Sequence, residues 1–242
     1  MVSSISQRER STILLASMKG LSMKHAKTLC ATALLALTAL GSTAAQAAGV
    51  EILNEGFNNV GGLSGWAQVN NSLPAGNAWF QGNTALFPAY AGAADSYAAV
   101  NFLSAANGAG NVDNWLITPT LDLSGTTVLN FATRHDGTPG FNDVLEVRFG
   151  AGSGTDPGSF STLLTTLGGA AGYPTDWDVF SAIVSAEGAG RFAFRYVGAA
   201  DTLNYVGLDS VSVVTAVPEP STWIMLAMGL GGLGLLRRRQ QT

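Results

Sequence analysis

Reactive side chains are scarce in this chain of 242 residues. Its single cysteine, Cys30, lies in an apolar stretch near the N-terminus, so the rest of the chain has no disulfide, cysteine metal site or cysteine nucleophile. Of the two histidines, only His135 lies outside that N-terminal region. No Gly-x-Ser-x-Gly or His-Glu-x-x-His pattern accompanies it. His135 lies in a polar turn after a predicted strand, where we expect it to face solvent without a catalytic role.

Lysine is absent between residues 48 and 217, a stretch that holds fourteen Asp and Glu residues. The net charge of −4 for the whole chain therefore hides a strongly acidic central body. Phosphate binding needs a cationic surface, which argues against nucleic acid as a partner. An acidic surface without lysine suits either simple solubility outside the cell or binding of divalent cations. The only cations of this stretch are Arg134, Arg148, Arg191 and Arg195.

Residues 1–47 predict a secretory signal peptide. Cations between residues 19 and 27 precede an uncharged apolar run at residues 29–40, and small residues precede the predicted cut after Ala47. The part before the cations is long and polar for a leader, so a start at Met18 or Met23 is an alternative to Met1.

The last segment, residues 217–242, carries three elements in a fixed order. Pro218 and Pro220 fix φ and donate no backbone hydrogen bond, so the chain is expected to stay extended around Glu219. The apolar run at residues 222–236 that follows is predicted to be a helix, shorter than the roughly 20 residues of a comfortable membrane span. Three arginines end the run, and the positive-inside rule keeps them at the cytoplasmic face.

This order of proline motif, apolar segment and arginine cluster resembles the PEP-CTERM sorting signals of Gram-negative bacteria. The resemblance implies export, at least transient anchoring in the membrane, and processing near the motif by an exosortase, a membrane transpeptidase-like protease. The alternative is a plain C-terminal anchor that is never cut. The residues that carry the resemblance are Val217, Pro218, Glu219, Pro220, Arg237, Arg238 and Arg239.

Residues 48–216 predict one all-β domain, because alternation with period two recurs between glycine-rich turns. At residues 191–197 the aromatic side chains fall on one face and the arginines on the other. Leu121 and Leu123 also alternate with polar residues before an expected turn at Gly125. Eight to eleven such strands predict a jelly-roll β-sandwich of two antiparallel sheets. The expected strands are residues 50–53, 66–69, 78–81, 98–102, 115–117, 128–134, 144–149, 163–167, 177–184, 191–197 and 205–214.

Several of these segments together resemble the choice-of-anchor J domain. They are Glu55-Gly56-Phe57, Asp113-Asn114-Trp115-Leu116-Ile117-Thr118-Pro119, Phe192-Ala193-Phe194-Arg195-Tyr196 and Asp209-Ser210-Val211. That family is similar to the cleaved-adhesin and MAM-type jelly rolls of secreted and surface proteins. The resemblance implies a module that is displayed through a surface anchor.

The same resemblance implies a calcium hypothesis, since related domains often hold a structural calcium near their paired termini. The first and last strands of a jelly roll commonly lie side by side, which would bring Glu55 and Asp209 together. Asp209 is predicted on the apolar face of the last strand, where a buried carboxylate needs a cation or hydrogen-bond donors. Backbone N–H groups, or an arginine such as Arg195, are the alternative to calcium. Weaker candidates for the same shell are Asn83, Asp95 and Asp113.

Two function classes remain open. One is a non-enzymatic adhesion or structural module of the cell surface or of an extracellular, exopolysaccharide-associated matrix. The other is a carbohydrate-binding module, which a planar row of exposed aromatic side chains would favour and their full burial would disfavour. A glycoside-acting enzyme is a distant third, because no pair of carboxylates stands out. The expected partners are signal peptidase, an exosortase, the membrane and polysaccharide, and the candidate sugar-stacking residues are Trp66, Trp79, Tyr90 and Trp177.

Overall fold

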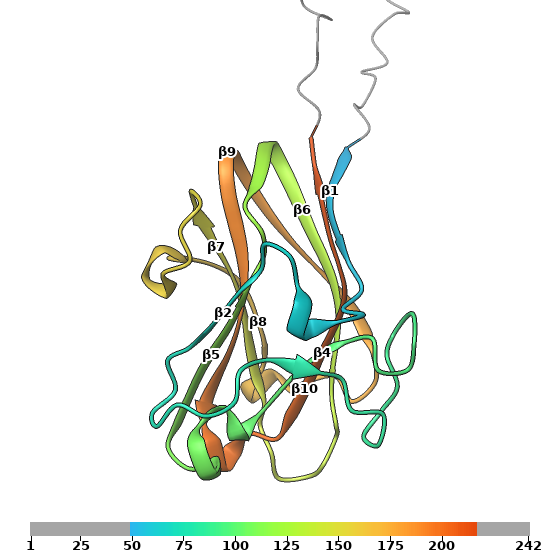
Figure 1. The fold of residues 1–242 in the computed structure, drawn as a ribbon, viewed down its shortest axis with the longest axis vertical. Helices are drawn as coiled ribbons and strands as arrows, with labels where there is room; N and C mark the ends of the chain where they lie inside the picture. The colour runs from blue at the N-terminus through green and yellow to red at the C-terminus, as the bar shows by residue number, and fades with distance from the viewer. Residues whose placement is uncertain (1–48, 217–242) are drawn as a thin grey trace, which may run out of the picture. The chain divides into compact units, whose positions relative to one another are not determined.

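The computed structural model describes residues 49–216, so the predicted signal peptide, sorting motif and C-terminal helix lie outside the described residues (Figure 1). Ten strands form within this range, together with short 3-10 turns. No helix among these residues is long and apolar enough to cross a membrane. The strands are β1 (Val50–Glu55), β2 (Ala67–Asn70), β3 (Phe80–Gln81), β4 (Ala98–Asn101), β5 (Asn111–Ile117), β6 (Leu121–His135), β7 (Val144–Ala151), β8 (Thr162–Gly168), β9 (Asp178–Ala199) and β10 (Tyr205–Thr215). The 3-10 turns are η1 (Val60–Gly62), η2 (Phe102–Ser104), η3 (Ala106–Gly108), η4 (Pro157–Ser159), η5 (Gly169–Ala171) and η6 (Ala200–Thr202).

The long antiparallel ladder between β6 and β9 joins the two layers of the sandwich. Its pairing runs without a break from Leu121 opposite Gly190 to Thr133 opposite Asp178. Both strands arch over at one end of the sandwich (Figure 1). Within this ladder Gly125 and Gly188 take positive φ values of 73° and 75°. Glycine tolerates this conformation, so the ladder bends without losing its hydrogen bonds. The turn expected at Gly125 is therefore a bend inside β6, and the two strands predicted at residues 177–184 and 191–197 are one strand.

Each half of β9 belongs to a different layer. Its first half pairs with β6, which pairs in turn with β10, while its second half lies between β5 and β7. β10 has β6 on one side and both β4 and β1 on the other. The first and last strands are therefore side by side, as predicted, with Val50 opposite Thr215.

One hydrophobic core fills the space between the layers. Phe131 of β6 meets Phe194 of β9 edge to face, with ring centroids 5.3 Å apart. Phe192, Phe194 and Tyr196 are fully buried in this core, which confirms the alternation predicted for their strand. A smaller cluster of Trp115, Ile117, Phe160 and Ala193 covers the opposite face of the same layer.

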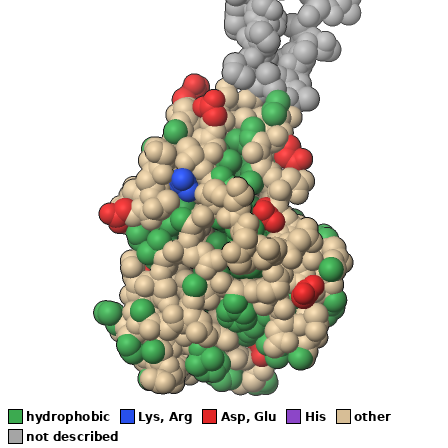
Figure 2. All heavy atoms as spheres, viewed as in Figure 1, with side chains coloured by type: hydrophobic (Ala, Val, Ile, Leu, Met, Phe, Trp, Pro, Cys, Tyr) green, Lys and Arg blue, Asp and Glu red, His purple; other side chains and the backbone are tan. Residues whose placement is uncertain are grey.

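The structure confirms an all-β antiparallel sandwich. Figure 2 shows one face of it, on which uncharged side chains predominate and acidic side chains are scattered. The single-domain prediction for residues 48–216 is compatible with these strands but is not tested by them.

Candidate functional site

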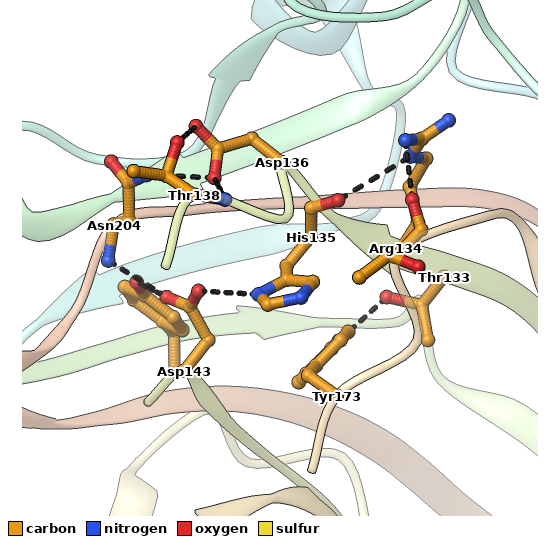
Figure 3. Close-up of polar contacts among 10 residues, drawn as sticks. Thr133, Arg134, His135, Asp136, Thr138, Asp143, Tyr173 and Asn204 are labelled. Atoms are coloured by element: carbon orange, nitrogen blue, oxygen red, sulfur yellow. Dashed lines mark hydrogen bonds and ion pairs between the residues drawn. The ribbon is translucent and has the colours of Figure 1, made fainter. Parts of the chain in front are cut away.

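A buried polar cluster lies at the end of the sandwich opposite Val50 and Thr215. Asp143, the residue before β7, is fully buried at its centre (Figure 3). Its Oδ1 accepts hydrogen bonds from the Tyr196 hydroxyl and, at 2.9 Å, from the backbone N–H of Asn204. Its Oδ2 lies 3.1 Å from His135 Nδ1. A buried carboxylate requires such partners, and the end of β6, β9 and the turn before β10 supply them here.

His135 corrects the expectation of a solvent-facing loop residue. It is the last residue of β6 and is 8% exposed, with its ring 5.5 Å from that of Tyr173. The prediction was wrong because β6 continues through this position: His135 pairs with Val206, and its backbone N–H bonds the Pro174 carbonyl at 2.9 Å. The imidazole therefore belongs to the packed end of the core.

The tyrosines of this cluster are held as hydrogen-bond donors. Burial raises the pKa of both Tyr173 and Tyr196, and the negative charge of Asp143 raises them further. The Tyr173 hydroxyl lies 2.6 Å from Thr133 Oγ1, which also donates to the Gly207 carbonyl. The cluster therefore ties β6, β9 and the loops before β7 and β10 together.

A second group of side chains, here called the aromatic patch, consists of Phe87, Tyr90, Arg134 and Trp177. The Trp177 ring meets Phe87 edge to face at 5.6 Å and lies 6.3 Å from Tyr90. Its indole N–H donates to the Pro88 carbonyl at 2.8 Å, which fixes the ring against the loop between β3 and β4. Tyr90 is 48% exposed and Trp177 is half-buried, so the patch presents aromatic surface to solvent.

Arg134 completes the aromatic patch from β6. Its guanidinium lies 4.3 Å from the centre of the Phe87 ring, within the range of a cation–π interaction. It also donates to the Thr175 carbonyl and lies 4.0 Å from Asp176, whose side chain is 96% exposed. Gly207 of β10 lies beneath the Phe87 and Trp177 rings, and a Cβ at this position would be 2.9 Å from an atom of each ring. The loop between β3 and β4 can therefore approach β10 this closely only because residue 207 is a glycine.

The other two candidate tryptophans do not join the aromatic patch. Trp79 is 3% exposed within the core, so its predicted role in stacking on a sugar is wrong: a ring enclosed on all sides offers no face to a ligand. Trp66 is half-buried, and its ring packs edge to face on Phe57 at 5.4 Å. Sugar contact by Trp66 or Trp177 stays a prediction.

Asp209 is buried on the face of β10 opposite the one that was expected. Ser210 takes a φ of 50° at a bulge, so Val211 points into the core while Asp209 lies on the outer side beneath the loop at residues 90–91. Its Oδ2 accepts the Ala91 N–H at 3.0 Å, and its Oδ1 accepts the Ser210 N–H at 2.5 Å. Burial raises the pKa of Asp209, and these backbone hydrogen bonds oppose the rise.

The proposed calcium partners of Asp209 have other contacts. Glu55 lies on neighbouring β1, and its Oε1 accepts the Phe57 N–H at 2.7 Å. Arg195 binds Asp113 at 2.6 Å and Glu146 at 3.0 Å rather than Asp209. Asn83 and Asp95 are exposed loop residues. Residues 49–216 contain no group of three or more His, Cys, Asp or Glu side chains placed to hold a metal ion. Calcium binding by Glu55 and Asp209 is an untested alternative to the backbone N–H groups that bond the Asp209 carboxylate.

Sequence reasoning missed Asp143 and Arg134. Asp143 follows Gly140, Phe141 and Asn142, a composition that indicates an exposed turn. Its hydrogen-bond partners are 8, 53 and 61 residues away in the sequence, so no short motif predicts these contacts. Arg134 was identified only as a cation, and its contact with Phe87 depends on a loop whose position the sequence does not indicate.

Comparison with known proteins decides the nature of the C-terminal segment. Residues 216–240 match the family model described as the PEP-CTERM protein-sorting motif. The chain carries that motif. This finding confirms the resemblance read from the proline motif and the arginines, and it makes the protein an exported one with a membrane-anchoring sorting signal. No curated protein sequence matches the chain.

Solved structures share the fold of the sandwich. The K1 cleaved adhesin domain of Lys-gingipain from Porphyromonas gingivalis W83 is 23% identical, with a TM-score of 0.55 over 68% of this chain and 98% of that domain. The K3 cleaved adhesin domain of the same protein is also 23% identical, with a TM-score of 0.52 over 69% of this chain and 99% of that domain. These likenesses confirm the adhesin-like β-sandwich as a fold.

Replacing Asp143 with alanine tests whether the buried cluster supports the fold. The change leaves the Tyr196 hydroxyl and the Asn204 N–H buried without an acceptor, so we expect the free energy of unfolding to fall by about 3–5 kcal/mol. Urea denaturation followed by tryptophan fluorescence measures it. Asp122→Ala is the matched control, because Asp122 is exposed on β6, and its effect should stay within about 0.5 kcal/mol. Equal effects of both substitutions would contradict the role given to Asp143.

Chelation separates the two roles open to Asp209. Because the carboxylate is satisfied by backbone N–H groups, we expect the Tm of the purified sandwich to be the same in EDTA and in millimolar calcium. Asp209→Ala should lower the Tm equally in both solutions, since it frees the loop at residues 90–91. A drop in Tm on chelation that is seen in the wild type and lost in Asp209→Ala would instead establish the calcium site.

Proposed function

We propose that this protein is delivered to the cell surface or extracellular matrix of a Gram-negative bacterium as a non-enzymatic adhesion or structural module. Signal peptidase removes the leader and an exosortase processes the tail near Pro218, Glu219 and Pro220. The observation that carries the proposal is the sorting motif at residues 216–240, which directly follows the last strand of the β-sandwich. The match identifies a sorting signal, and the sandwich is then the cargo that it sorts.

The position of the two strand ends supports this assignment. β1 begins at Val50 and β10 ends at Thr215, directly opposite each other at one end of the sandwich (Figure 1). The Asp143 cluster and the first residue of β10, Tyr205, belong to the other end. A domain held through its terminal strands would therefore present the loops of that far end to its surroundings.

The charged side chains support a structural rather than a catalytic module. Arg195 bridges Asp113 and Glu146, and Arg148 also binds Glu146 at 2.7 Å. These arginines keep Glu146 ionised, because their hydrogen bonds lower its pKa despite the cost of burial. A general acid in glycoside hydrolysis requires the opposite shift. The only histidine of the sandwich is bound to Asp143 within the core.

Deleting residues 217–242 tests the sorting proposal. We expect the truncated protein in the medium or periplasm, while the wild type stays associated with the cell surface or matrix. The mass of the mature wild-type protein should show a start after Ala47 and the loss of the tail beyond the Pro-Glu-Pro motif. Fractionation, immunoblotting and intact-mass spectrometry measure these outcomes. The double substitution of Pro218 and Pro220 by alanine should also block processing, whereas Pro139→Ala in an exposed loop should not.

A carbohydrate-binding module is the second candidate, and the aromatic patch favours it. Tyr90 and Trp177 offer adjoining ring surfaces whose positions are fixed by Phe87 and the Pro88 carbonyl. Rigid rings of this kind bind with little loss of conformational freedom. The half-buried Trp66 shows no comparable arrangement with a second exposed ring.

Binding to immobilised glycans tests the second candidate. If the aromatic patch is the binding surface, Tyr90→Ala and Trp177→Ala should each weaken glycan binding about tenfold, because a central aromatic side chain contributes more than about 1 kcal/mol. Phe141→Ala, an exposed aromatic residue outside the patch, is the control and should bind like the wild type. Affinities come from a glycan array followed by titration, with Tm measured for each variant. Full binding by both patch variants would end this assignment.

A further inference from the structure

The end of β10 is fixed on both sides up to its last residues. Thr215 is 5% exposed and pairs with Val50 of β1 on one side and Thr127 of β6 on the other. The next residue, Ala216, still donates its backbone N–H to the Thr126 carbonyl at 2.9 Å. Main-chain bonding to the sandwich therefore extends at least to Ala216.

A buried pair of hydroxyl groups holds this end in place. Thr215 Oγ1 lies 2.8 Å from Thr127 Oγ1, and Thr127 is fully buried. Thr215 Oγ1 also accepts the backbone N–H of Ser124 at 2.9 Å. Releasing Thr215 breaks these bonds and leaves buried polar groups without their partners until water replaces them, which opposes opening of the strand.

The opposite side of the strand is closely packed as well. A Cβ on Gly49 would lie 2.4 Å from Val214 Cγ1 and 3.1 Å from the Thr215 carbonyl, so the start of the described chain lies against the end of β10. The predicted leader cut after Ala47 is only two residues before Gly49. Removing the leader thus leaves almost no chain beyond the strand that covers Thr215.

Only Val217 separates Ala216 from Pro218 of the sorting motif. Two steps along an extended chain span at most about 7 Å. A protease that holds its substrate as an extended strand bonds to main-chain groups on both sides of the cut. An enzyme that cuts within two residues of Pro218 would engage Thr215 and Ala216. Thr215 is paired on both sides within the sandwich, and the Ala216 N–H is bonded to the Thr126 carbonyl.

We propose that tail processing requires the end of β10 to open first, and that the Thr215–Thr127 hydroxyl pair sets how often it opens. This inference rests on the proposed processing by an exosortase. Processing then follows the population of a locally opened strand end rather than global unfolding. The folded sandwich thereby controls the rate at which its own sorting signal is used.

A linker inserted between Ala216 and Val217 tests the proposal. Six residues of alternating Gly and Ser give the enzyme free chain to hold, so we expect tail removal several-fold faster than in the wild type. Pulse labelling in the host that encodes the protein, followed by immunoprecipitation, measures the ratio of unprocessed to processed chains. The same insertion after Gly154, in an exposed loop, is the control and should leave the rate unchanged.

Thr215→Val supplies the complementary test, because it keeps the β-branched shape and removes the hydroxyl group. We expect tail removal about three- to tenfold faster in the wild-type background and no further acceleration in the linker variant. Hydrogen exchange at the Ala216 amide should accelerate by a similar factor. Thr166→Val on β8 is the matched control, since its side chain is exposed.

Each outcome decides the matter. An unchanged or slower rate in the linker variant overturns the proposed control by strand opening, even if Thr215→Val fails to fold. Equal acceleration by Thr215→Val in both backgrounds overturns it as well. A wild type that keeps its tail throughout overturns the processing itself. If the wild type loses its tail at the same rate as the linker variant, only the control by strand opening is overturned.

Discussion

The folded-over ladder of β6 and β9 is the constraint on which the rest of the sandwich depends. Its uninterrupted pairing carries one pair of strands from one layer into the other, so both layers are in register from the start. Phe131 on one layer and Phe194 on the other meet because the ladder arches between them. The bend depends on Gly125 and Gly188, whose positive φ values would strain any residue with a Cβ. β10 and β5 then add to edges whose positions this ladder has already set.

The sequence predicted the β-class and most strands because their alternation is local. Arginine and aromatic residues alternate at residues 191–197, and this pattern alone fixes which face is buried. It predicted the strand boundaries less well where glycine is ambiguous. Gly125 and Gly188 indicate a turn or a bend equally, and only the pairing of distant residues decides between them. The bulge at Ser210 was also not predictable from the local sequence. It adds one residue to β10 and so places Asp209 on the face opposite the one expected from alternation.

The candidate sites were harder to predict, because each is assembled from segments far apart in the chain. Asp143 is in a stretch that reads as an exposed turn, yet Tyr196 and Asn204 enclose it. Trp79 and Trp177 have the same chemistry in the sequence, and only their packing in the folded chain makes one a core residue and the other a half-buried one. The sorting motif was predicted almost completely, because its three parts are contiguous and need no tertiary contact.

The arginines of the sandwich have a consequence for its durability. Residues 49–216 contain no lysine, and none of their four arginines is exposed: Arg134, Arg148 and Arg195 take part in ion pairs, and Arg191 donates to the Thr118 carbonyl. Trypsin-like enzymes cut after lysine or arginine in accessible, extended chain, and this domain offers them no such bond while it is folded. After export, its resistance to digestion by such enzymes would depend on the placement of four side chains.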